Sequence, residues 1–364
     1  MLWFKLALYK VLSNEVLVFS LHLFIILAVE RIRNQFYAGP LKDADESMNV
    51  YQRNEDMLRQ EKSAASAQTG TKDAGSGSEE YRLVAREYSA KYRGNLETSR
   101  FTIRGVEVGA DKPLIIAGPC AVHSYKQTIE ITQSVKEAGA DMLRGGAYKP
   151  RTSPYSFQGL GLKGLEILAE AREITELPIV TEVMDQLKVE EVGYYADVLQ
   201  IGARNMQNYA LLRDVGKYAA EHKKGVLLKT GPLPKLKEVL CAAEYLALEG
   251  AKKIIICERG INNPADSMRN TPRPNFLTEL RKATYLPVIG DPSHSTGRRD
   301  LVPQIATEFL DAAANGLLID VIRDDEKKII NDVEVCDYEQ GLRASDFKRF
   351  IDKIKPRKVP QKWP

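Results

Sequence analysis

The sequence predicts an α/β protein, a (β/α)8 barrel of the TIM type with an N-terminal helical extension. Two observations carry this prediction: eight short apolar runs follow residue 112, and amphipathic segments of helical length separate most of them. Because the runs largely do not alternate between apolar and polar residues, we expect a parallel sheet that is covered on its outer face and closes into a barrel of eight βα units. The expected strands are Pro113–Gly118, Met142–Gly146, Pro178–Val183, Val198–Gly202, Gly225–Lys229, Lys253–Cys257, Pro287–Asp291 and Gly316–Val321.

The segments between these runs have the apolar spacing of helices and serve as crossovers. Ahead of the first strand, Phe101–Val108 alternates around Gly105, which predicts a short hairpin. The expected helices include Gln127–Gly139, Gly161–Thr175, Tyr209–Glu221, Leu236–Glu249 and Arg299–Asn315.

Three regimes of composition divide the chain. Residues 1–62 have helical spacing and form the extension, and residues 63–78 are small, polar and glycine-rich, which predicts a flexible linker. Residues 79–364 form the barrel, which begins with a short helix and the hairpin.

The extension contains an apolar run, Val16–Val29, of about 14 residues. A membrane-spanning helix needs about 20, and the charged residues that follow do not form a signal-peptide cleavage site. We therefore favour a helix buried against protein over a membrane anchor.

The overall composition narrows the class of protein further. The formal charge of +3 does not indicate a nucleic-acid-binding surface. The four cysteines have no CxxC spacing, so we expect reduced thiols and a cytoplasmic protein.

Cationic side chains gather where the predicted strands end, which is where barrels of this type place their active sites. Like charges repel unless an anion neutralises them, and guanidinium groups match phosphate and carboxylate oxygens. Any one of these cations could equally be an ordinary solvated surface residue. Six of them at strand ends favour a binding site for phosphorylated substrates. These residues are Arg144, Lys149, Arg151, Arg204, Lys229 and Arg259.

A second set of strand-end residues could hold a metal ion. Cys120, His294, Asp320 and Asp332 offer a thiolate, an imidazole and two carboxylates, which suit manganese, iron, cobalt or zinc. The spacing alone is weak, since Cys120 could be a small core residue and His294 a helix-start histidine. Because the same strand ends also carry the cationic cluster, we favour the metal site over these structural roles.

The strings that carry these residues resemble the 3-deoxy-7-phosphoheptulonate (DAHP) synthase family in its shorter microbial subgroup. The resemblance runs in order from about Phe101 to Leu342. It is carried by AGPCAVHS (117–124), LRGGAYKPRTSPYSFQGLG (143–161), TEVMD (181–185), QIGARNMQN (200–208), CERG (257–260) and DPSHSTGRRDLV (291–302).

The resemblance implies a metal-dependent transferase. Such an enzyme condenses phosphoenolpyruvate with erythrose 4-phosphate, releases phosphate and so begins the shikimate pathway to aromatic amino acids. Lys149, Cys120 and His294 would be the catalytic residues, with Lys149 as the proton donor to the forming alkoxide.

The resemblance also implies which residues bind each partner. Arg144 and Lys149 would hold the carboxylate of phosphoenolpyruvate. Its phosphate would be held by Arg204, Lys229, Arg259 and the backbone of Ala203; the aldose phosphate by Pro150, Arg151, Thr152 and Asp291; and the divalent ion by Cys120, His294, Asp320 and Asp332.

Several positions depart from the family pattern. Asp320 stands where the family has a glutamate, Thr230 replaces the arginine of KRG, His123 replaces the glutamate of AVES, and Gly290 replaces a hydrophobic residue. The segment around Asp332 lacks the family string SDGxQ.

These departures leave two alternatives: an enzyme that uses a longer sugar such as arabinose 5-phosphate, which the KPRT string argues against, and a low-activity regulatory paralogue. The extension resembles the helical chorismate mutase domain that some members carry, but only Arg31, Lys42 and Arg53 could bind a dicarboxylate. We therefore expect a dimerising or regulatory helical cap, and a homodimer or homotetramer.

Overall fold

The computed structural model describes residues 81–86, 97–263, 268–330 and 333–361. The chain divides into two units, of which Met1–Asp73 lies wholly outside the described residues. The predictions for the extension, including Val16–Val29, and for the linker therefore stay predictions. Within the described ranges, no helix combines the length and the apolar character that crossing a bilayer requires.

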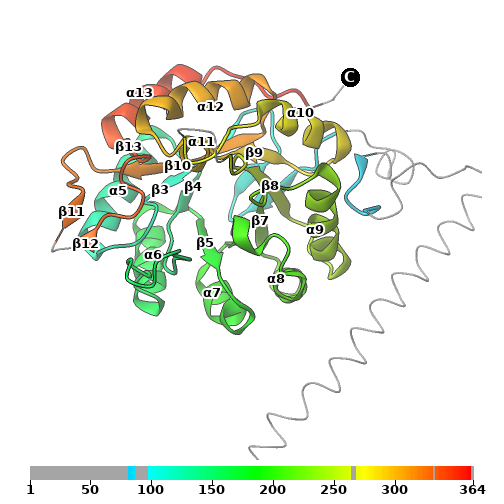
Figure 1. The fold of residues 1–364 in the computed structure, drawn as a ribbon, viewed down its shortest axis with the longest axis horizontal. Coiled ribbons are helices and arrows are strands. Elements are labelled where there is room, and N and C mark those ends of the chain that lie inside the picture. The colour runs from blue at the N-terminus through cyan, green and yellow to red at the C-terminus, as the bar shows by residue number, and fades with distance from the viewer. Residues whose placement is uncertain (1–80, 87–96, 264–267, 331–332, 362–364) are drawn as a thin grey trace, which may run out of the picture. The chain divides into compact units, whose positions relative to one another are not determined.

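Eight parallel strands form a closed barrel, because β10 pairs with β9 on one side and with β3 on the other (Figure 1). All eight predicted strands are confirmed, and every residue within the observed strand bounds is buried. The barrel strands are β3 (Leu114–Gly118), β4 (Met142–Arg144), β5 (Ile179–Val183), β6 (Val198–Ile201), β7 (Gly225–Lys229), β8 (Ile254–Glu258), β9 (Val288–Gly290) and β10 (Gly316–Ile322).

Helices surround this sheet on its outer side (Figure 1). The predicted helix over Arg299–Asn315 is shorter than expected, because Pro303 suits only a first helical turn. The helices are α5 (Tyr125–Ala138), α6 (Leu162–Thr175), α7 (Val189–Tyr195), α8 (Tyr209–Glu221), α9 (Leu236–Leu248), α10 (Pro274–Ala283), α11 (Pro292–Thr296), α12 (Val302–Asp311) and α13 (Ala344–Ile354), with short 3-10 turns η1 (Gln186–Lys188), η2 (Ala203–Asn205) and η3 (Arg299–Leu301).

The predicted hairpin closes one end of the barrel. Its strands β1 (Phe101–Ile103) and β2 (Val106–Val108) are antiparallel. Ile103 and Val108 are buried in the cluster that fills the barrel interior. The opposite end, where the strands terminate, is left for chemistry.

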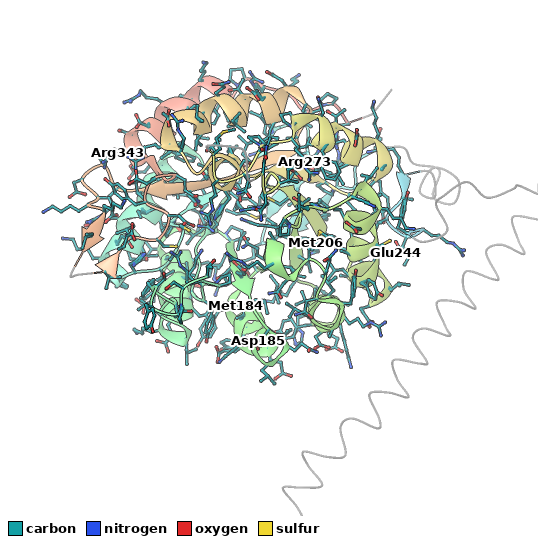
Figure 2. The ribbon with its side chains drawn as sticks, viewed as in Figure 1. Met184, Asp185, Met206, Glu244, Arg273 and Arg343 are labelled. Carbon is teal, nitrogen blue, oxygen red and sulfur yellow. The ribbon has the colours of Figure 1, made fainter. Side chains whose placement is uncertain are left out.

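Two contacts show how the barrel wall is completed. At Gly290 on β9, a Cβ atom would lie 2.5 Å from the ring of Phe309, so the glycine makes room for that side chain. Ahead of the hairpin, the backbone N–H groups of Leu83 and Val84 donate to the carboxylate of Glu244 on α9, which Figure 2 labels.

Three short strands lie outside the barrel proper. β11 (Ile329–Ile330) and β12 (Val333–Glu334) form a two-stranded ribbon, and β13 (Leu342–Arg343) pairs in parallel with the end of β10. The segment 333–343 therefore returns to the carboxyl end of the barrel.

Candidate active site

A pocket of about 180 Å³ lies at the carboxyl ends of the strands and brings the predicted cations together. Five of the six line it, namely Lys149, Arg151, Arg204, Lys229 and Arg259, and Pro150 and Ala203 line it with them. The sixth, Arg144, is buried and donates from NH1 to the carbonyl of Pro119.

Four potential metal ligands also converge here. One ligand atom from each of Cys120, His294, Asp320 and Asp337 lies within 4.8 Å of all the others. Asp332, the fourth ligand predicted from the sequence, lies outside the described residues. Asp337 was missed, although Asp337 and Gln340 keep the D-x-x-Q spacing of the family string SDGxQ and could have identified it.

The His294 ring is oriented by Asp291, the N-cap residue of α11. The Nδ1 atom lies 2.9 Å from Asp291 Oδ2, while Nε2 faces Asp320 Oδ2 at 3.8 Å and Asp337 Oδ2 at 3.7 Å. Burial lowers the pKa of His294 to about 4 despite the opposing charge of Asp291. With its proton on Nδ1, the neutral imidazole presents a lone pair on Nε2 to the cluster, as metal-binding histidines do.

Both carboxylates of the cluster are ionised. Burial is the largest single influence on Asp320 and raises its pKa, but Arg144, whose NH1 lies 2.8 Å from Oδ1, together with His294 and Gln340 lowers the pKa below its usual value. The pKa of Asp337 is likewise lowered against burial, chiefly by Arg269 at 2.9 Å.

The cluster suits a divalent cation. Asp320 Oδ1 is buried and, although close to Arg144, has no hydrogen-bond geometry with any described partner. A buried oxygen of this kind is costly unless a cation or donor satisfies it. One thiol, one imidazole and two carboxylates fit manganese, iron, cobalt or zinc.

A second thiol adjoins this cluster. Cys336 Sγ lies 3.5 Å from Cys120 Sγ, and the Cys120 thiol also lies 3.1 Å from Asp337 Oδ2. The contact with Cys336, together with burial, raises the pKa of Cys120, and the same contact lowers that of Cys336 to about 7. A cation that takes Cys120 as a ligand must therefore displace its proton.

Lys149 occupies the centre of the site. Its Nζ donates to the Cys120 carbonyl at 3.1 Å and lies 3.3 Å from Cys120 Sγ. Gly146 makes room for it, because a Cβ there would lie 2.6 Å from Lys149 Cδ. Burial is the largest single influence on Lys149 and lowers its pKa, but Cys120, Cys336 and Glu182 together outweigh burial and the cationic Arg144, so the pKa is raised. Lys149 therefore carries a proton at Nζ.

The other cations of the pocket are fixed by neighbouring polar groups. Lys229 Nζ lies 2.6 Å from Asp291 Oδ2. Arg259 donates to Asn270 Oδ1, and burial lowers the pKa of Arg259. Arg204 donates to the carbonyl of Pro150 at 2.9 Å, so two substrate-binding segments predicted from the sequence are in contact.

Two residues predicted to contact the aldose phosphate lie near Arg204 or the cluster. Thr152 accepts a hydrogen bond from Arg204 NH2 at 3.3 Å, and Arg151 NH1 lies 2.9 Å from Cys336 Sγ. Asp291 differs from them: it is fully buried, contacts Lys229 and His294, and lies behind the pocket lining.

Thr230, which stands where the family has an arginine, lies next to a buried carboxylate that another arginine contacts. Thr230 donates to the buried carboxylate of Glu258 at 2.9 Å. Arg273, labelled in Figure 2, forms an ion pair with the same carboxylate at 3.0 Å. A cation from α10's N-cap position therefore neutralises Glu258.

Comparison with known proteins agrees with this architecture. Residues 87–354 match the DAHP synthetase I family. A phospho-2-dehydro-3-deoxyheptonate aldolase from Thermotoga maritima is 41% identical over 275 residues, 76% of this chain and 77% of that protein. A 2-dehydro-3-deoxyphosphooctonate aldolase from Francisella tularensis is 30% identical over 60% of this chain and 84% of its own.

Solved structures give the same answer. A crystal structure of DAHP synthase from Thermotoga maritima has a TM-score of 0.69 at 40% identity and covers 76% of each chain. A truncated form of that organism's 3-deoxy-D-arabino-heptulosonate 7-phosphate synthase has a TM-score of 0.67 at 38% identity, covering 76% of this chain and 96% of its own. On the family match and these relatives together, the chain belongs to the DAHP synthetase I family.

Proposed function

We propose that the barrel condenses phosphoenolpyruvate with erythrose 4-phosphate and consumes water, giving 3-deoxy-D-arabino-heptulosonate 7-phosphate and phosphate. The observation that carries the proposal is the position of Lys149. Its Nζ lies 3.3 Å from the Sγ of Cys120, a potential metal ligand, and its side chain lines the same pocket as the cations suited to binding phosphate, Arg204, Lys229 and Arg259. Family membership supports the reaction class.

Phosphoenolpyruvate would take the inner part of the pocket. Arg144 and Lys149 would hold its carboxylate, since both are cationic and buried. Arg204, Lys229, Arg259 and the backbone of Ala203 would hold its phosphate. Fixing both anionic groups leaves the enol carbon as the mobile, reactive end.

The acceptor sugar would take the outer part. Pro150, Arg151 and Thr152 form one segment beside Arg204 and would hold the aldose phosphate. Asp291, initially predicted to join them, is better suited to positioning, because its carboxylate contacts His294 and Lys229.

A divalent ion would be held by Cys120, His294, Asp320 and Asp337, with Asp332 as an alternative fourth ligand. When bound, such an ion would polarise the aldehyde carbonyl of the acceptor. Lys149 holds a proton at Nζ beside the cluster, and this proton would neutralise the alkoxide that the condensation creates.

The test is a phosphate-release assay on the full chain. We expect release only when phosphoenolpyruvate, erythrose 4-phosphate and manganese, cobalt or zinc are all present. Arabinose 5-phosphate is the informative comparison, because the Francisella relative is named as a phosphooctonate aldolase. Turnover with arabinose 5-phosphate and none with erythrose 4-phosphate would reject the proposed acceptor.

The cellular location and the oligomeric state of the protein are also proposals. The barrel's substrates are those of central metabolism, which agrees with the expected cytoplasmic location. A homodimer or homotetramer remains our expectation, and light scattering of the full chain would measure it.

A further inference from the structure

Gln340 is a buried amide that belongs to neither the pocket lining nor the predicted ligand set. Its Nε2 donates to Asp320 Oδ2 at 2.5 Å, and its Oε1 accepts from Arg269 NH1 at 2.8 Å. Both ends of the amide are therefore committed, which fixes its orientation.

Arg269 extends this chain of contacts to the second carboxylate. The same NH1 lies 2.9 Å from Asp337 Oδ1. The Arg269 guanidinium therefore contacts Asp337 directly and is linked to Asp320 through the side chain of Gln340. Asp337 Oδ2 is left facing Cys120 Sγ at 3.1 Å and His294 Nε2 at 3.7 Å.

The turn that carries Asp337 and Gln340 is itself held in place. Arg299 donates from its backbone N–H to the Glu339 carbonyl at 2.8 Å and from NH2 to the Tyr338 carbonyl at 2.6 Å. The following strand β13 pairs with β10, the strand of Asp320. The two carboxylates and the amide between them therefore sit on segments with fixed separation.

We propose that Gln340 and Arg269 are positioning residues that orient the Asp320 and Asp337 carboxylates toward a divalent cation. The inference rests on the metal site of the proposed function. A neutral amide suits this place because it directs the Asp320 carboxylate without adding a positive charge that would oppose the ion. Partners that orient metal ligands in this way typically contribute about 10–100-fold to metal affinity.

The first test replaces Gln340 by methionine, which has nearly the same length but neither donates nor accepts at those positions. We expect cobalt(II) to bind about 10–100-fold more weakly. The ligand-field absorption should shift because the Asp320 carboxylate is free to turn, while the thiolate-to-cobalt band persists because Cys120 is unchanged. Neither signal requires substrate.

The matched control is Gln304→Met on α12. Gln304 is exposed, and its side-chain amide donates to Glu308 Oε1 at 2.9 Å. The same chemical change should leave the cobalt affinity and spectrum as in the wild type.

Two further variants separate positioning from folding. Gln340→Asn keeps the amide, but its side chain is too short to contact both Asp320 and Arg269, so we expect it to weaken cobalt binding as well. It serves as the test of the proposal in case Gln340→Met does not fold. Arg269→Lys keeps a cation for Asp337 but loses the planar fork, and should bind cobalt more tightly than Arg269→Met and less tightly than wild type.

Cobalt affinity and spectrum unchanged in both folded Gln340 variants would overturn the positioning role, whatever the turnover. By contrast, a wild-type protein that binds cobalt but releases no phosphate from the two substrates would overturn the proposed function. The cobalt results for Gln340 would still stand in that case.

Discussion

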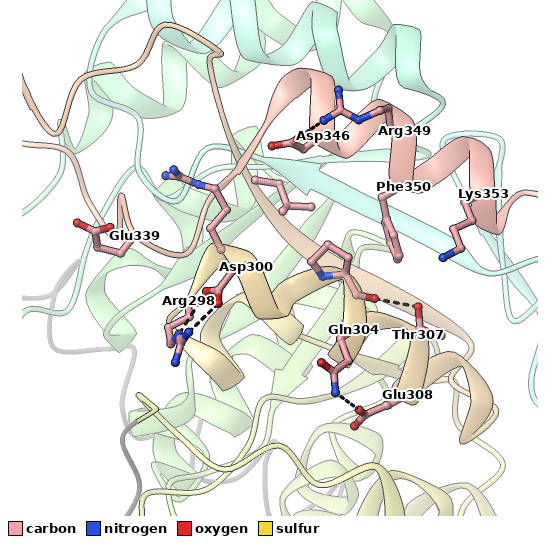
Figure 3. A pocket seen from close by; sticks show the side chains of 13 residues that line it. Arg298, Asp300, Gln304, Thr307, Glu308, Glu339, Asp346, Arg349, Phe350 and Lys353 are labelled. Atoms are coloured by element: carbon pink, nitrogen blue, oxygen red, sulfur yellow. Dashed lines mark hydrogen bonds and ion pairs between the residues drawn. The ribbon is translucent and has the colours of Figure 1, made fainter.

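The pocket at the barrel mouth and a groove on the outside of the barrel differ in how deeply their ion pairs are buried. The groove lies between α12 and α13, is larger at about 1000 Å³ against about 180 Å³, and carries both signs of charge (Figure 3). Its ion pairs are short-range and exposed, such as Arg349 with Asp346 one turn earlier. At the mouth, the pairs of Lys229 with Asp291 and of Arg144 with Asp320 are buried and join separate elements.

This difference identifies the site better than size does. Exposed ion pairs contribute little, whereas burying two charges costs several kcal/mol per ion and is often no better than burying hydrophobic residues. Stability alone therefore does not account for Arg144, Lys229 and Asp291 at the barrel mouth. Their positions around one pocket indicate function, while the larger groove is ordinary solvated surface.

The sharpest contrast is expected from removing a ligand at the mouth. In Cys120→Ala, turnover should fall by about 1000-fold or more, since a metal Lewis acid contributes several kcal/mol to the transition state. Treatment with a chelator should have the same effect, reversed by adding cobalt or manganese. Phosphate release measures both.

Cys241→Ala on α9 is the matched control and should retain full turnover. If Cys120→Ala kept more than about a tenth of the activity, the thiol would not be a ligand on which the reaction depends.

The second contrast concerns stability. Lys229→Met leaves Asp291 buried without its cation, and breaking a buried pair in this way costs about 3–5 kcal/mol in the free energy of unfolding. Urea denaturation measures the change. Lys353→Met, the same substitution in the groove, should leave the unfolding midpoint unchanged. Equal effects at the two positions would remove the distinction between mouth and groove.

His123 gives a smaller, pH-dependent contrast. Its Nε2 accepts from the Cys336 N–H at 2.9 Å, and burial lowers its pKa to about 4. An unfolded histidine has a pKa of about 6.5, so between these values the unfolded chain binds the extra proton. Stability should therefore be complete above about pH 6.5 and fall as the pH drops toward 4, by at most about 3 kcal/mol.

His123→Gln should reduce this slope, because an amide accepts at every pH, while His294 supplies the slope that remains. Urea unfolding between pH 4 and 7 is the measurement. His222→Gln, on an exposed side chain at the end of α8, is the control. An unchanged slope in His123→Gln would mean that the imidazole is protonated equally in both states.

The barrel could be predicted from the sequence because its strands are buried on both faces. Continuous apolar runs such as Leu114–Gly118 and Ile254–Cys257 follow directly from that burial. Residues at strand ends could also be predicted as a group, since parallel strands end at one rim. The convergence of Cys120 and His294 follows from this rule.

Other parts of the site depend on loops that have no periodicity. Asp337 lies beyond a ribbon, and only its spacing from Gln340 marked it. The position of Asp291 behind His294, and the pairing of Arg273 with Glu258, depend on side-chain directions that strand patterns do not encode. The same is true of Gly290, whose partner Phe309 is distant in sequence.

The smallest expected effect is the coupling between Arg349 and Asp346 in the groove, measured by a double-mutant cycle with Arg349→Met and Asp346→Asn. Their side chains are 74% and 38% exposed, so water and side-chain entropy offset most of the attraction. We expect a coupling of about 0.3–0.5 kcal/mol, reduced further in 1 M salt, and no change in turnover. A coupling above about 1.5 kcal/mol would be typical of ordered, desolvated charges. The groove would then have to be counted as a second site, and the comparison with the barrel mouth would no longer separate function from surface.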